Sequence, residues 1–320
     1  MTASTYPHFQ AATIDDLLNA IYRDLLANGE EVTATKGPNR ERIGVILELE
    51  NPRARLSRSE TRGKLFSCLG EFCWYWSGTS DPAFIQYYIP WYAKLLEDGR
   101  LPGAYGPRLF NWAGKSQIEA VLGLLRKRPS SRQAVVQIFD RSDLDAKHED
   151  VPCTCTLQFF VRNEQLHLVT HMRSNDAFLG LAHDVFSFTM MQEVVAIRLG
   201  VGLGSYRHLV GSLHLYERDV AEAKAFLDEG YQSTQQTMPP MPTERVEIGM
   251  SRLLEAESAI RLGAVLDEAR TNDLHPYWAD LVRLLQIFRA FRDDDHETAS
   301  RIAELLDADF YRTFVQMRKG

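Results

Sequence analysis

The chain has 320 residues, 45% hydrophobic and 25% charged, a composition typical of a globular protein with one large domain or a large and a small one. Its net charge of −7 argues against a nucleic-acid groove or an anionic membrane surface as its target, so an anionic substrate must be held by a local group of arginines. No apolar run of about 18 residues occurs and no secretory signal is visible, which predicts a cytoplasmic protein without a membrane-spanning helix.

The hydrophobic pattern predicts alternating helices and strands over the first two thirds of the chain. In chain order, it predicts a helix at 12–29, a strand at 44–50, helices at 63–77 and 82–97, a loop at 101–112, a helix at 116–128, a strand at 134–140, paired strands at 156–162 and 166–173, a helix at 183–199 and a strand at 205–216. Two prolines and two glycines indicate the loop at 101–112. The helix at 183–199 is apolar almost all round, which is typical of a central buried helix.

From residue 217 onward the pattern is helical, with one interruption by a Pro- and polar-rich stretch at 232–244. We therefore predict a main domain at 1–231, a linker at 232–244 and a helical C-terminal extension at 245–320. The sequence assigns no role to this extension.

The four cysteines are Cys68, Cys73, Cys153 and Cys155. Their spacing fits no zinc site, so we expect no metal and free thiols in a reducing compartment. A lone cysteine in a strand is usually a small core residue. Cys153 is the candidate nucleophile because of the polar residues that come after it in the chain. Cys155 is its rival, since the two-residue strand period predicts that both lie on one face.

Polar residues are unusually dense after Cys153, beside strands that are otherwise apolar. They are Arg173, Ser174, Asp176 and Asp184, followed by His214 and Tyr216 on one face of a predicted strand. Each of these groups needs a partner if it is buried, so a purely structural role for all of them is unfavourable. The cluster indicates a site.

The order and spacing of these motifs resemble the thymidylate synthase superfamily. The family's Pro-Cys pair with a glutamine five residues after the cysteine is matched by Pro152, Cys153 and Gln158. Its Arg-Ser-x-Asp, Leu-Gly-Leu and His-x-Tyr motifs follow without a gap, as Arg173-Ser174-x-Asp176, Leu179-Gly180-Leu181 and His214-x-Tyr216. Upstream, looser matches place Glu71 in the family's catalytic-glutamate helix, Tyr105 in its Tyr-Gly loop, Arg132 in its Ser-Arg motif and Arg42, or else Arg40, in its N-terminal phosphate loop.

This resemblance implies an α+β fold, in which a mixed β-sheet forms a homodimer interface and is flanked by helices. Residues 1–231 would be the catalytic domain. The substrate would be a pyrimidine nucleoside monophosphate and the co-substrate 5,10-methylenetetrahydrofolate. The Cys153 thiolate would add to C6 of the base and so activate C5 toward a one-carbon electrophile. A neighbouring Arg173 would lower the pKa of this thiol.

The resemblance also implies the contacts around the substrate. Arg42, Arg173 and Ser174 would hold the 5′-phosphate together with Arg132 of the partner subunit, because guanidinium groups bind phosphate oxygens in pairs. Gln133 departs from the family pattern, which usually has a second arginine there. The other expected contacts are Gln158 and Tyr105 with the nucleotide, His214 and Tyr216 with the sugar hydroxyl, Glu71 with water and protons at the base, and Asp176 and Trp91 with the folate.

Some of these residues have plain structural alternatives. Arg42 and Arg132 could be surface arginines, His214 a satisfied core histidine, and Trp91 a core residue. Glu71 could be a carboxylate in a buried ion pair, because an unpaired carboxylate in an apolar helix is costly.

Asp184 is the informative departure from the family pattern, since a thymidylate synthase has asparagine at this position. An asparagine amide offers the donor and acceptor that suit O4 and N3–H of uracil. An ionised aspartate would instead accept from the amino group of cytosine and stabilise a protonated N3. The superfamily's deoxycytidylate hydroxymethylases are similar to this chain in having aspartate there. Two other departures from the synthase pattern also favour a hydroxymethylase: Thr154 stands where the synthases usually have a histidine, and Ala182-His183 stand where they have Pro-Phe.

The chain ends in RTFVQMRKG, without the short apolar tail that closes a synthase site against water. We therefore expect water to add at the last step, which gives 5-hydroxymethylation of CMP or dCMP. The first alternative is a thymidylate synthase or a dUMP hydroxymethylase that tolerates Asp184. The second is a catalytically silent nucleotide-binding protein. The choice between CMP and dCMP, and hence the pathway, stays open, because both sugars carry the 3′-hydroxyl.

Overall fold

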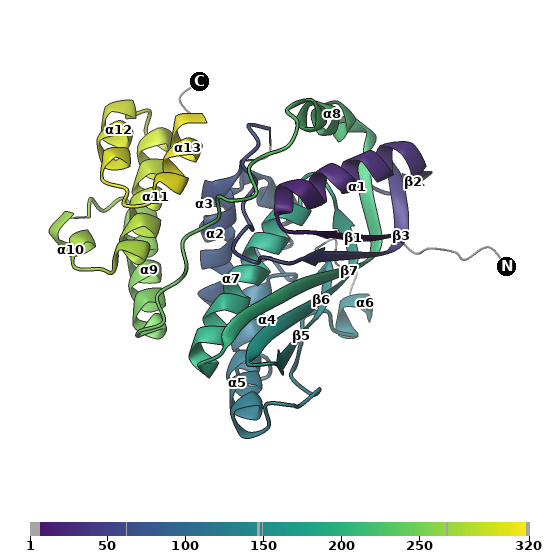
Figure 1. Ribbon diagram of the computed structural model, residues 1–320, viewed down its shortest axis with the longest axis horizontal. Coiled ribbons are helices and arrows are strands. Elements are labelled where there is room, and N and C mark those ends of the chain that lie inside the picture. Colours follow the sequence, from purple (N-terminus) through teal and green to yellow (C-terminus); the bar gives the residue numbers. More distant parts are fainter. Residues whose placement is uncertain (1–6, 62, 146–147, 149, 267, 318–320) are drawn as a thin grey trace.

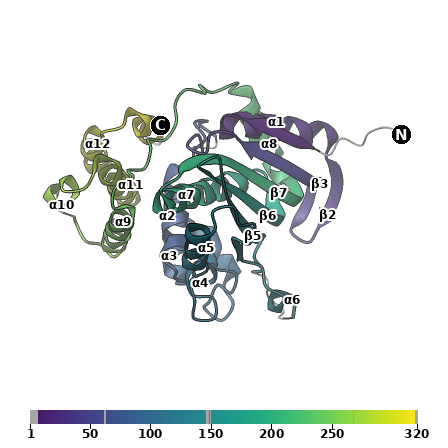
Figure 2. The same cartoon turned by 60° about the horizontal axis from the view of Figure 1, so that its bottom comes forward.

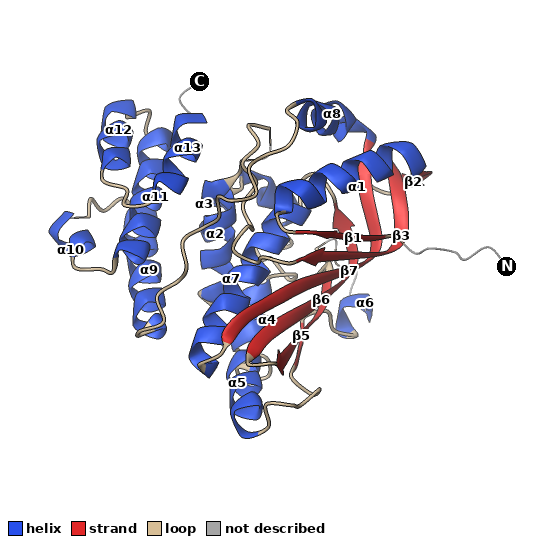
Figure 3. Ribbon diagram, viewed as in Figure 1, coloured by secondary structure: helices blue, strands red, loops and turns tan. Residues whose placement is uncertain are grey.

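Alternating apolar residues build a mixed sheet of seven strands in the part of the chain that the computed structural model describes, which is all except residues 1–6, 62, 146–147, 149, 267 and 318–320. The strand order is β1-β3-β7-β6-β5-β4, and β2 pairs with β3. The strands are β1 (His8–Ala11), β2 (Glu30–Ala34), β3 (Gly37–Leu49), β4 (Val135–Gln137), β5 (Thr154–Arg162), β6 (Gln165–Asp176) and β7 (Gly202–Tyr216). Strands β6 and β7 are parallel, and both β3–β7 and β5–β6 are antiparallel (Figure 3).

Helices flank this sheet, as the α+β class requires. Helix α7 (Leu181–Leu199) is buried along most of its length, as its all-round apolar pattern predicts, and ends at Gly200 in the left-handed conformation. It packs on β6 and β7, and α2 and α5 pack on α7 (Figure 2). The other helices before residue 230 are α1 (Ile14–Asn28), α2 (Leu65–Trp76), α3 (Pro82–Tyr88), η1 (Pro90–Leu95), α4 (Tyr105–Phe110), α5 (Gln117–Lys127), α6 (Ser142–Asp145), η2 (Glu217–Asp219) and α8 (Val220–Asp228).

Two sequence predictions of helices and loops need correction. The predicted loop at 101–112 contains α4, because its prolines stand before or in the first turn of the helix, where a missing N–H costs nothing. The predicted helix at 82–97 is divided into α3 and the 3-10 helix η1, because Pro90 cannot continue the hydrogen bonding of α3. Strands β1 and β2 carry too short a pattern to be predicted, since β2 pairs only with β3 and is mostly exposed.

The hairpin of β5 and β6 positions the predicted nucleophile. Asn163 and Glu164 form its turn with φ angles of 49° and 57°, which match the twist of the two strands. At the other end of β5 the pairing shifts between Thr154 and Thr156, which is a bulge. Cys153 lies immediately before this irregular stretch.

The C-terminal helices form a compact group at the end of the molecule away from the N-terminus (Figure 1). They are α9 (Val246–Arg261), α10 (Glu268–Asn272), α11 (Pro276–Arg292), α12 (His296–Glu304) and α13 (Asp309–Met317). The group packs on the main body through aromatic rings, with Phe288 stacked on Phe66 at 5.8 Å and on Tyr88 at 5.1 Å.

Residues 229–245, which join the two parts, form no helix or strand. Met238 and Met241 of this segment are nonetheless buried, and the Met238 N–H donates to the carbonyl of Arg53 (3.1 Å). The segment therefore follows the surface of the main body. The division at 231 and 245 stays a prediction. Among the described helices none has both the length and the apolar character needed to cross a membrane.

Candidate active site

Cys153 and Arg173 lie opposite each other where β5 and β6 begin to separate. The Arg173 N–H donates to the Cys153 carbonyl (2.8 Å), and the Arg173 Nη2 atom lies 3.7 Å from the Cys153 Sγ. The same guanidinium donates to the carbonyls of Val151 and Pro152, each at 2.9 Å. Burial raises the pKa of the Cys153 thiol, and the positive charge of Arg173 opposes that rise. A larger thiolate fraction therefore requires a stronger positive field at the sulfur.

Cys155 lies within the bulge of β5, so the two-residue period does not carry from Cys153 to it. Burial raises the pKa of its thiol, and only Arg173 opposes that. Cys153, in contrast, is in the field of Asp184, Lys36 and Asp150 as well. The two thiols thus share one arginine, but only Cys153 has the charged groups of the cluster around it.

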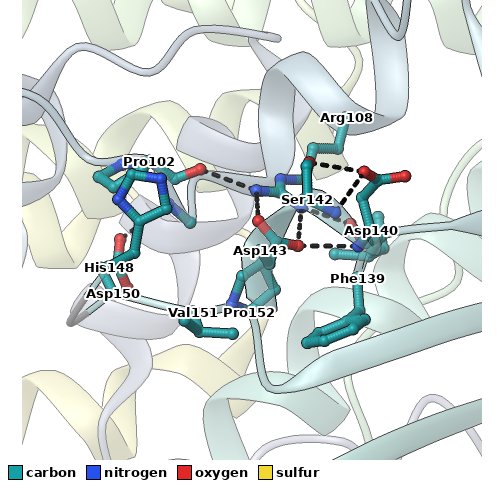
Figure 4. A network of polar contacts seen from close by, with 12 residues as sticks. Pro102, Arg108, Phe139, Asp140, Ser142, Asp143, His148, Asp150, Val151 and Pro152 are labelled. Atoms are coloured by element: carbon teal, nitrogen blue, oxygen red, sulfur yellow. Dashed lines mark hydrogen bonds and ion pairs between the residues drawn. The ribbon is translucent and has the colours of Figure 1, made fainter. Parts of the chain in front are cut away.

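A buried arginine of α4 holds the segment that leads to Cys153. Arg108 forms a two-pronged ion pair with Asp143, with both N–O distances at 2.7 Å, and donates to the carbonyls of Ile138 (2.7 Å) and Pro102 (2.9 Å). Figure 4 shows how these bonds converge on one guanidinium between α4 and the chain after β4. A fork of donors with a fixed geometry defines the course of a chain that has little regular structure.

Glu71 is buried in α2 and receives hydrogen bonds from tyrosines. The Tyr92 hydroxyl donates to its Oε1 atom at 2.7 Å. Burial raises the pKa of Glu71 to about 7, although hydrogen bonds from Tyr92 and Tyr75 oppose that rise. A carboxyl group that titrates near neutral pH can both give and take a proton under physiological conditions.

Asp184 lies in the first turn of α7, and it is also buried. The Asn175 Nδ2 atom donates to its Oδ2 atom at 2.7 Å. Burial raises the pKa of Asp184 well above its ordinary value, the nearby Glu71 raises it further, and the Asn175 amide opposes both effects. The ionised carboxylate assumed from the sequence is thus disfavoured before substrate binds, because no cation among the described residues compensates its charge.

Tyr105 contacts both α2, which carries Glu71, and the start of β5, which follows Cys153. Its ring stacks on Tyr75 of α2 with 4.8 Å between centroids, and its hydroxyl accepts a hydrogen bond from the Thr154 N–H at 3.2 Å. Both Asp184 and Cys153 raise the pKa of its phenol, after burial itself, which places all three groups within one electrostatic neighbourhood. The motif residues from α2, α4, β5 and α7 therefore converge.

His214 and Asp176 are partners in the register of β6 and β7, at the far side of the same cluster. The His214 ring meets Tyr216 edge to face at 4.9 Å, in agreement with the shared face predicted for them. Burial lowers the pKa of His214, and the charges of Asp176 and Glu41 oppose that effect. Asp176 accepts the N–H groups of Phe178 and Leu179 at one oxygen, each at 2.9 Å.

The two candidate arginines of the phosphate loop make other contacts in this structure. Arg42 pairs with Asp24 of α1 at 3.1 Å, and Arg40 pairs with Glu217 at 2.9 Å. The β3 residue in register with His214 is Glu41. The nucleotide-binding role of Arg42 or Arg40 therefore stays a prediction, and it requires either guanidinium to leave its present carboxylate.

Three further expected contact residues are Arg132, Ser174 and Trp91. Arg132 is exposed, and its carbonyl accepts from the Gln158 amide at 2.9 Å. Ser174 is paired in register with Ser212 of β7. Trp91 is 47% exposed, so it is not a core residue, and its ring lies 5.8 Å from the Lys36 Nζ atom.

Sequence reasoning missed three members of this cluster. They are Lys36, Tyr92 and Asn175, from the β2–β3 turn, η1 and β6. Asn175 is the unassigned position inside the Arg-Ser-x-Asp motif, and Tyr92 is adjacent to Trp91, so both lie next to residues that the motifs had identified. No motif lies near Lys36 in the sequence, because only the folded hairpin brings it to Trp91 and close enough for its charge to act on Cys153.

Comparison with known proteins agrees with this arrangement. Residues 31–248 match the family model described as "Thymidylate synthase". The chain is 29% identical over 230 residues to a thymidylate synthase of Bacillus subtilis subsp. natto, which covers 66% of this chain and 82% of that protein. A thymidylate synthase of Bacillus phage phi3T gives the same identity and coverage, and one of Bacillus atrophaeus is 30% identical over 168 residues, 49% of this chain and 73% of that protein. The matched region contains the cluster around Cys153 and strands β3 to β7 of the sheet. The chain therefore belongs to the thymidylate synthase family, whose members are one-carbon transferases that use methylenetetrahydrofolate and a nucleoside monophosphate.

Proposed function

We propose that this member of the family is a cytidylate 5-hydroxymethylase, which converts CMP or dCMP with methylenetetrahydrofolate and water. The observation that carries the proposal is Asp184, a buried carboxyl beside a second buried carboxyl, Glu71, at the position where synthases have asparagine. It is supported by the charge of Asp184 acting on the Cys153 thiol and by the charge of Glu71 acting on Asp184.

Asp184 supports a cytosine base through its proton. A neutral carboxyl group has one O–H donor and one oxygen that is free to accept. Its O–H can therefore donate to N3 of cytosine while its other oxygen accepts from the N4 amino group. Transfer of that proton to N3 gives a carboxylate beside a protonated base, which contains the same atoms and the same total charge. Both arrangements make the base more electron-poor at C6, where the thiolate attacks.

The reaction that these groups support is redox-neutral. Cys153 Sγ adds to C6, and the electron pair of the C5–C6 bond moves to C5, which bonds to the one-carbon unit that methylenetetrahydrofolate supplies at the formaldehyde level. C5 then loses its proton, tetrahydrofolate leaves, and the oxygen of a water molecule adds to the new exocyclic carbon. Glu71 takes the proton of that water, and the C6–S bond breaks to return the Cys153 thiolate. The Glu71 pKa of about 7 suits this exchange.

Asp176, Trp91 and Lys36 have the chemistry that a folate needs. Asp176 makes no hydrogen bond through its Oδ2 atom within the described residues, so this oxygen is available to the N–H groups of a pterin. The exposed indole of Trp91 offers a flat apolar surface for the ring system. Lys36, beside Trp91, offers a positive charge to an anionic ligand.

The remaining expected residues would bind the nucleotide. Arg173, Ser174 and Arg42 would hold the phosphate with Arg132 of a second copy of the chain, so the active form would be a homodimer. His214 and Tyr216 would hold the sugar hydroxyl. Gln158 and Tyr105 would contact the nucleotide near Cys153, where Tyr105 lies already.

A thymidylate synthase is the second candidate, and the names of the similar Bacillus proteins favour it. A neutral Asp184 could also serve uracil, if its proton sat on the oxygen that faces O4. In that case the last step would be a hydride transfer and the product a methyl group. A catalytically silent nucleotide-binding protein is the third candidate.

Incubation of the purified protein with methylenetetrahydrofolate and each of CMP, dCMP, UMP and dUMP tests the proposal. We expect the cytidine nucleotides to react faster and their mass to increase by one CH2O unit, because a hydroxymethyl group replaces the hydrogen at C5, with tetrahydrofolate as the second product. The variant D184N should shift the preference toward the uridine nucleotides, with each mismatched group worth about 1–3 kcal/mol. Faster turnover of dUMP by the wild type would overturn the proposal, and a lack of C5 tritium release from every nucleotide would favour the silent protein.

A further inference from the structure

Asn175 and Asp184 form a buried hydrogen-bonded pair between the end of β6 and the start of α7. Their side chains are both buried, with 4% and 8% of the residue exposed. The Asn175 Nδ2 atom donates to Asp184 Oδ2 at 2.7 Å, while the Asn175 Oδ1 atom is buried without a hydrogen-bond partner among the described residues. A buried amide oxygen without a partner is costly, so this asparagine is retained at a cost in stability.

The backbone leaves room for this pair. A Cβ atom at Gly180 would lie 3.3 Å from Asn175 Nδ2 and 3.5 Å from Asp184 Oδ2. Gly180 precedes α7 and makes the turn that brings Asp184 back toward β6, with the Asp184 N–H donating to its carbonyl at 3.0 Å. The two side chains are thus held from one strand end and one helix start.

The hydrogen bond makes the two oxygens of Asp184 unequal. In a neutral carboxyl group the carbonyl-type oxygen is the better acceptor, so a donor to Oδ2 favours the proton on Oδ1. No hydrogen bond within the described residues involves Oδ1. The oxygen that is left for a ligand is therefore the one that carries the proton, while Oδ2 keeps its second lone pair as an acceptor.

We propose that Asn175 is a positioning residue for base selection, which fixes the Asp184 proton on Oδ1 so that the pair presents a donor at Oδ1 and an acceptor at Oδ2 in one defined order. This rests on the proposed function, because that order suits cytosine when Oδ1 faces N3 and Oδ2 faces the N4 amino group. Without Asn175 the proton can sit on either oxygen, and the opposite order suits O4 and N3–H of uracil equally well.

No other described group selects which oxygen of Asp184 carries the proton. The charged groups that act on it are Glu71 of α2 and Asp176 of β6, and both disfavour its ionised form. The negative charge of Asp184 raises the pKa of four nearby phenols, which are Tyr75 in α2, Tyr92 in η1, Tyr105 in α4 and Tyr206 in β7. Among the described side chains, only Asn175 makes a direct hydrogen bond to the Asp184 carboxyl group.

The experiment compares the wild-type protein with N175A and with N175L, which keeps the branched shape of the side chain without its polar atoms if the smaller variant does not fold. The first readout is the ratio of kcat/KM for CMP to that for UMP. We expect both variants to lower this ratio about tenfold, because one buried hydrogen bond no longer separates the two bases. The control is N19A, which removes a buried asparagine of α1 whose side chain bonds only Arg23 among the described residues, at 2.8 Å.

The second readout needs no substrate. The protonated Asp184 should give an infrared carboxylic C=O band that is absent from D184N and that moves to higher frequency in N175A, since its carbonyl loses a donor. A wild type that prefers UMP would overturn the proposed function and leave this band test in force. An unchanged base ratio together with an unchanged band in the Asn175 variants would overturn the role of Asn175, even if the wild type prefers CMP.

Discussion

Buried carboxylates occur in two regions of this molecule, and different groups surround them. Glu193, in the C-terminal half of α7, forms ion pairs with Arg53 and Arg55 of the segment after β3. Those two charges lower the pKa of Glu193 although it is buried. At the opposite end of α7, Asp184 accepts a hydrogen bond from Asn175. Glu71 of α2, which acts on Asp184, accepts one from Tyr92. Burial there raises both pKa values, and no arginine or lysine pairs with either carboxyl among the described residues.

The difference separates a structural use of a buried acid from a chemical one. An acid that is paired with arginine stays ionised and holds segments together, and its removal leaves an unpaired cation. An acid without a cation binds its proton more tightly than it would in water, which suits it to proton exchange during a reaction. Under the proposed function both uses occur along the single helix α7, so the surroundings decide the role and not the residue type.

The largest expected effect is on Cys153, the proposed nucleophile, whose thiol lies in the field of Asp184. Cys153→Ser should lower kcat by about 10⁴-fold or more, because a serine hydroxyl ionises far less readily than a thiol. The measurement is tritium release from C5 of the preferred nucleotide. Cys155→Ser is the matched control, since it removes the neighbouring thiol in the bulge of β5. Equal losses in the two variants would mean that the bulge, and not the Cys153 thiol, is what matters.

The next effect concerns proton exchange at Glu71. Glu71→Gln should lower kcat by roughly 10²- to 10⁴-fold, the range for removal of a general acid or base. The wild-type rate should change with an apparent pKa of about 7, and this inflection should be absent from the variant. Glu119→Gln, at a surface ion pair with Arg198, is the control. A variant that retains the inflection would assign it to Asp184 or another group.

The arginine-paired acid should respond in stability and not in chemistry. Glu193→Ala leaves the fully buried Arg55 without its partner and removes the acceptor of the Met241 N–H, so we expect the free energy of unfolding to fall by about 3–5 kcal/mol. Chemical denaturation at neutral pH measures this loss. KM and kcat of the folded variant should stay close to the wild type at low temperature. A large fall in kcat with little loss of stability would break the distinction between the two regions.

The smallest effect is the dependence of stability on pH. Glu71 has a folded-state pKa of about 7 against an ordinary value of 4.5, so the folded state binds its proton more tightly. Stability should therefore fall as pH rises from 4.5 to about 7, whereas below 4.5 the group is protonated in both states. Glu71→Gln removes this loss, and we expect it to stabilise the protein by about 3 kcal/mol at alkaline pH relative to acidic pH.

Denaturation curves of the wild type and Glu71→Gln at several pH values give this difference directly. A gain of equal size at acidic and alkaline pH would show that the glutamine improves packing and does not remove a buried charge. Glu193 provides the opposite sign, since its lowered pKa means that its contribution is present above the ordinary value and is lost as pH falls through the folded one.

Much of the fold and of the cluster could be predicted because the signals are local. The apolar pattern of α7, the alternation of β5 to β7 and the turn at Asn163 depend on residues close in the chain. The motifs from residue 152 to residue 216 lie on adjacent strands and on α7, so their spacing in the sequence predicts which of them lie close together in space. The helix α4 was missed, because its stability comes from the Arg108–Asp143 contact and from packing, not from its own Pro- and Gly-rich sequence.

The sequence by itself determined the family, the α+β class and the group of residues around Cys153, because ordered motifs survive as spacing along one chain. Only the tertiary structure decided which charges meet. It pairs Arg40 and Arg42 with acids of other elements, brings Lys36 to Trp91, and sets Glu71 near Asp184 with no described cation paired to either. The physical reason is that a pKa depends on burial and on neighbours distant in sequence, so the protonation of Asp184, on which the proposed choice of base depends, cannot be read from its identity alone.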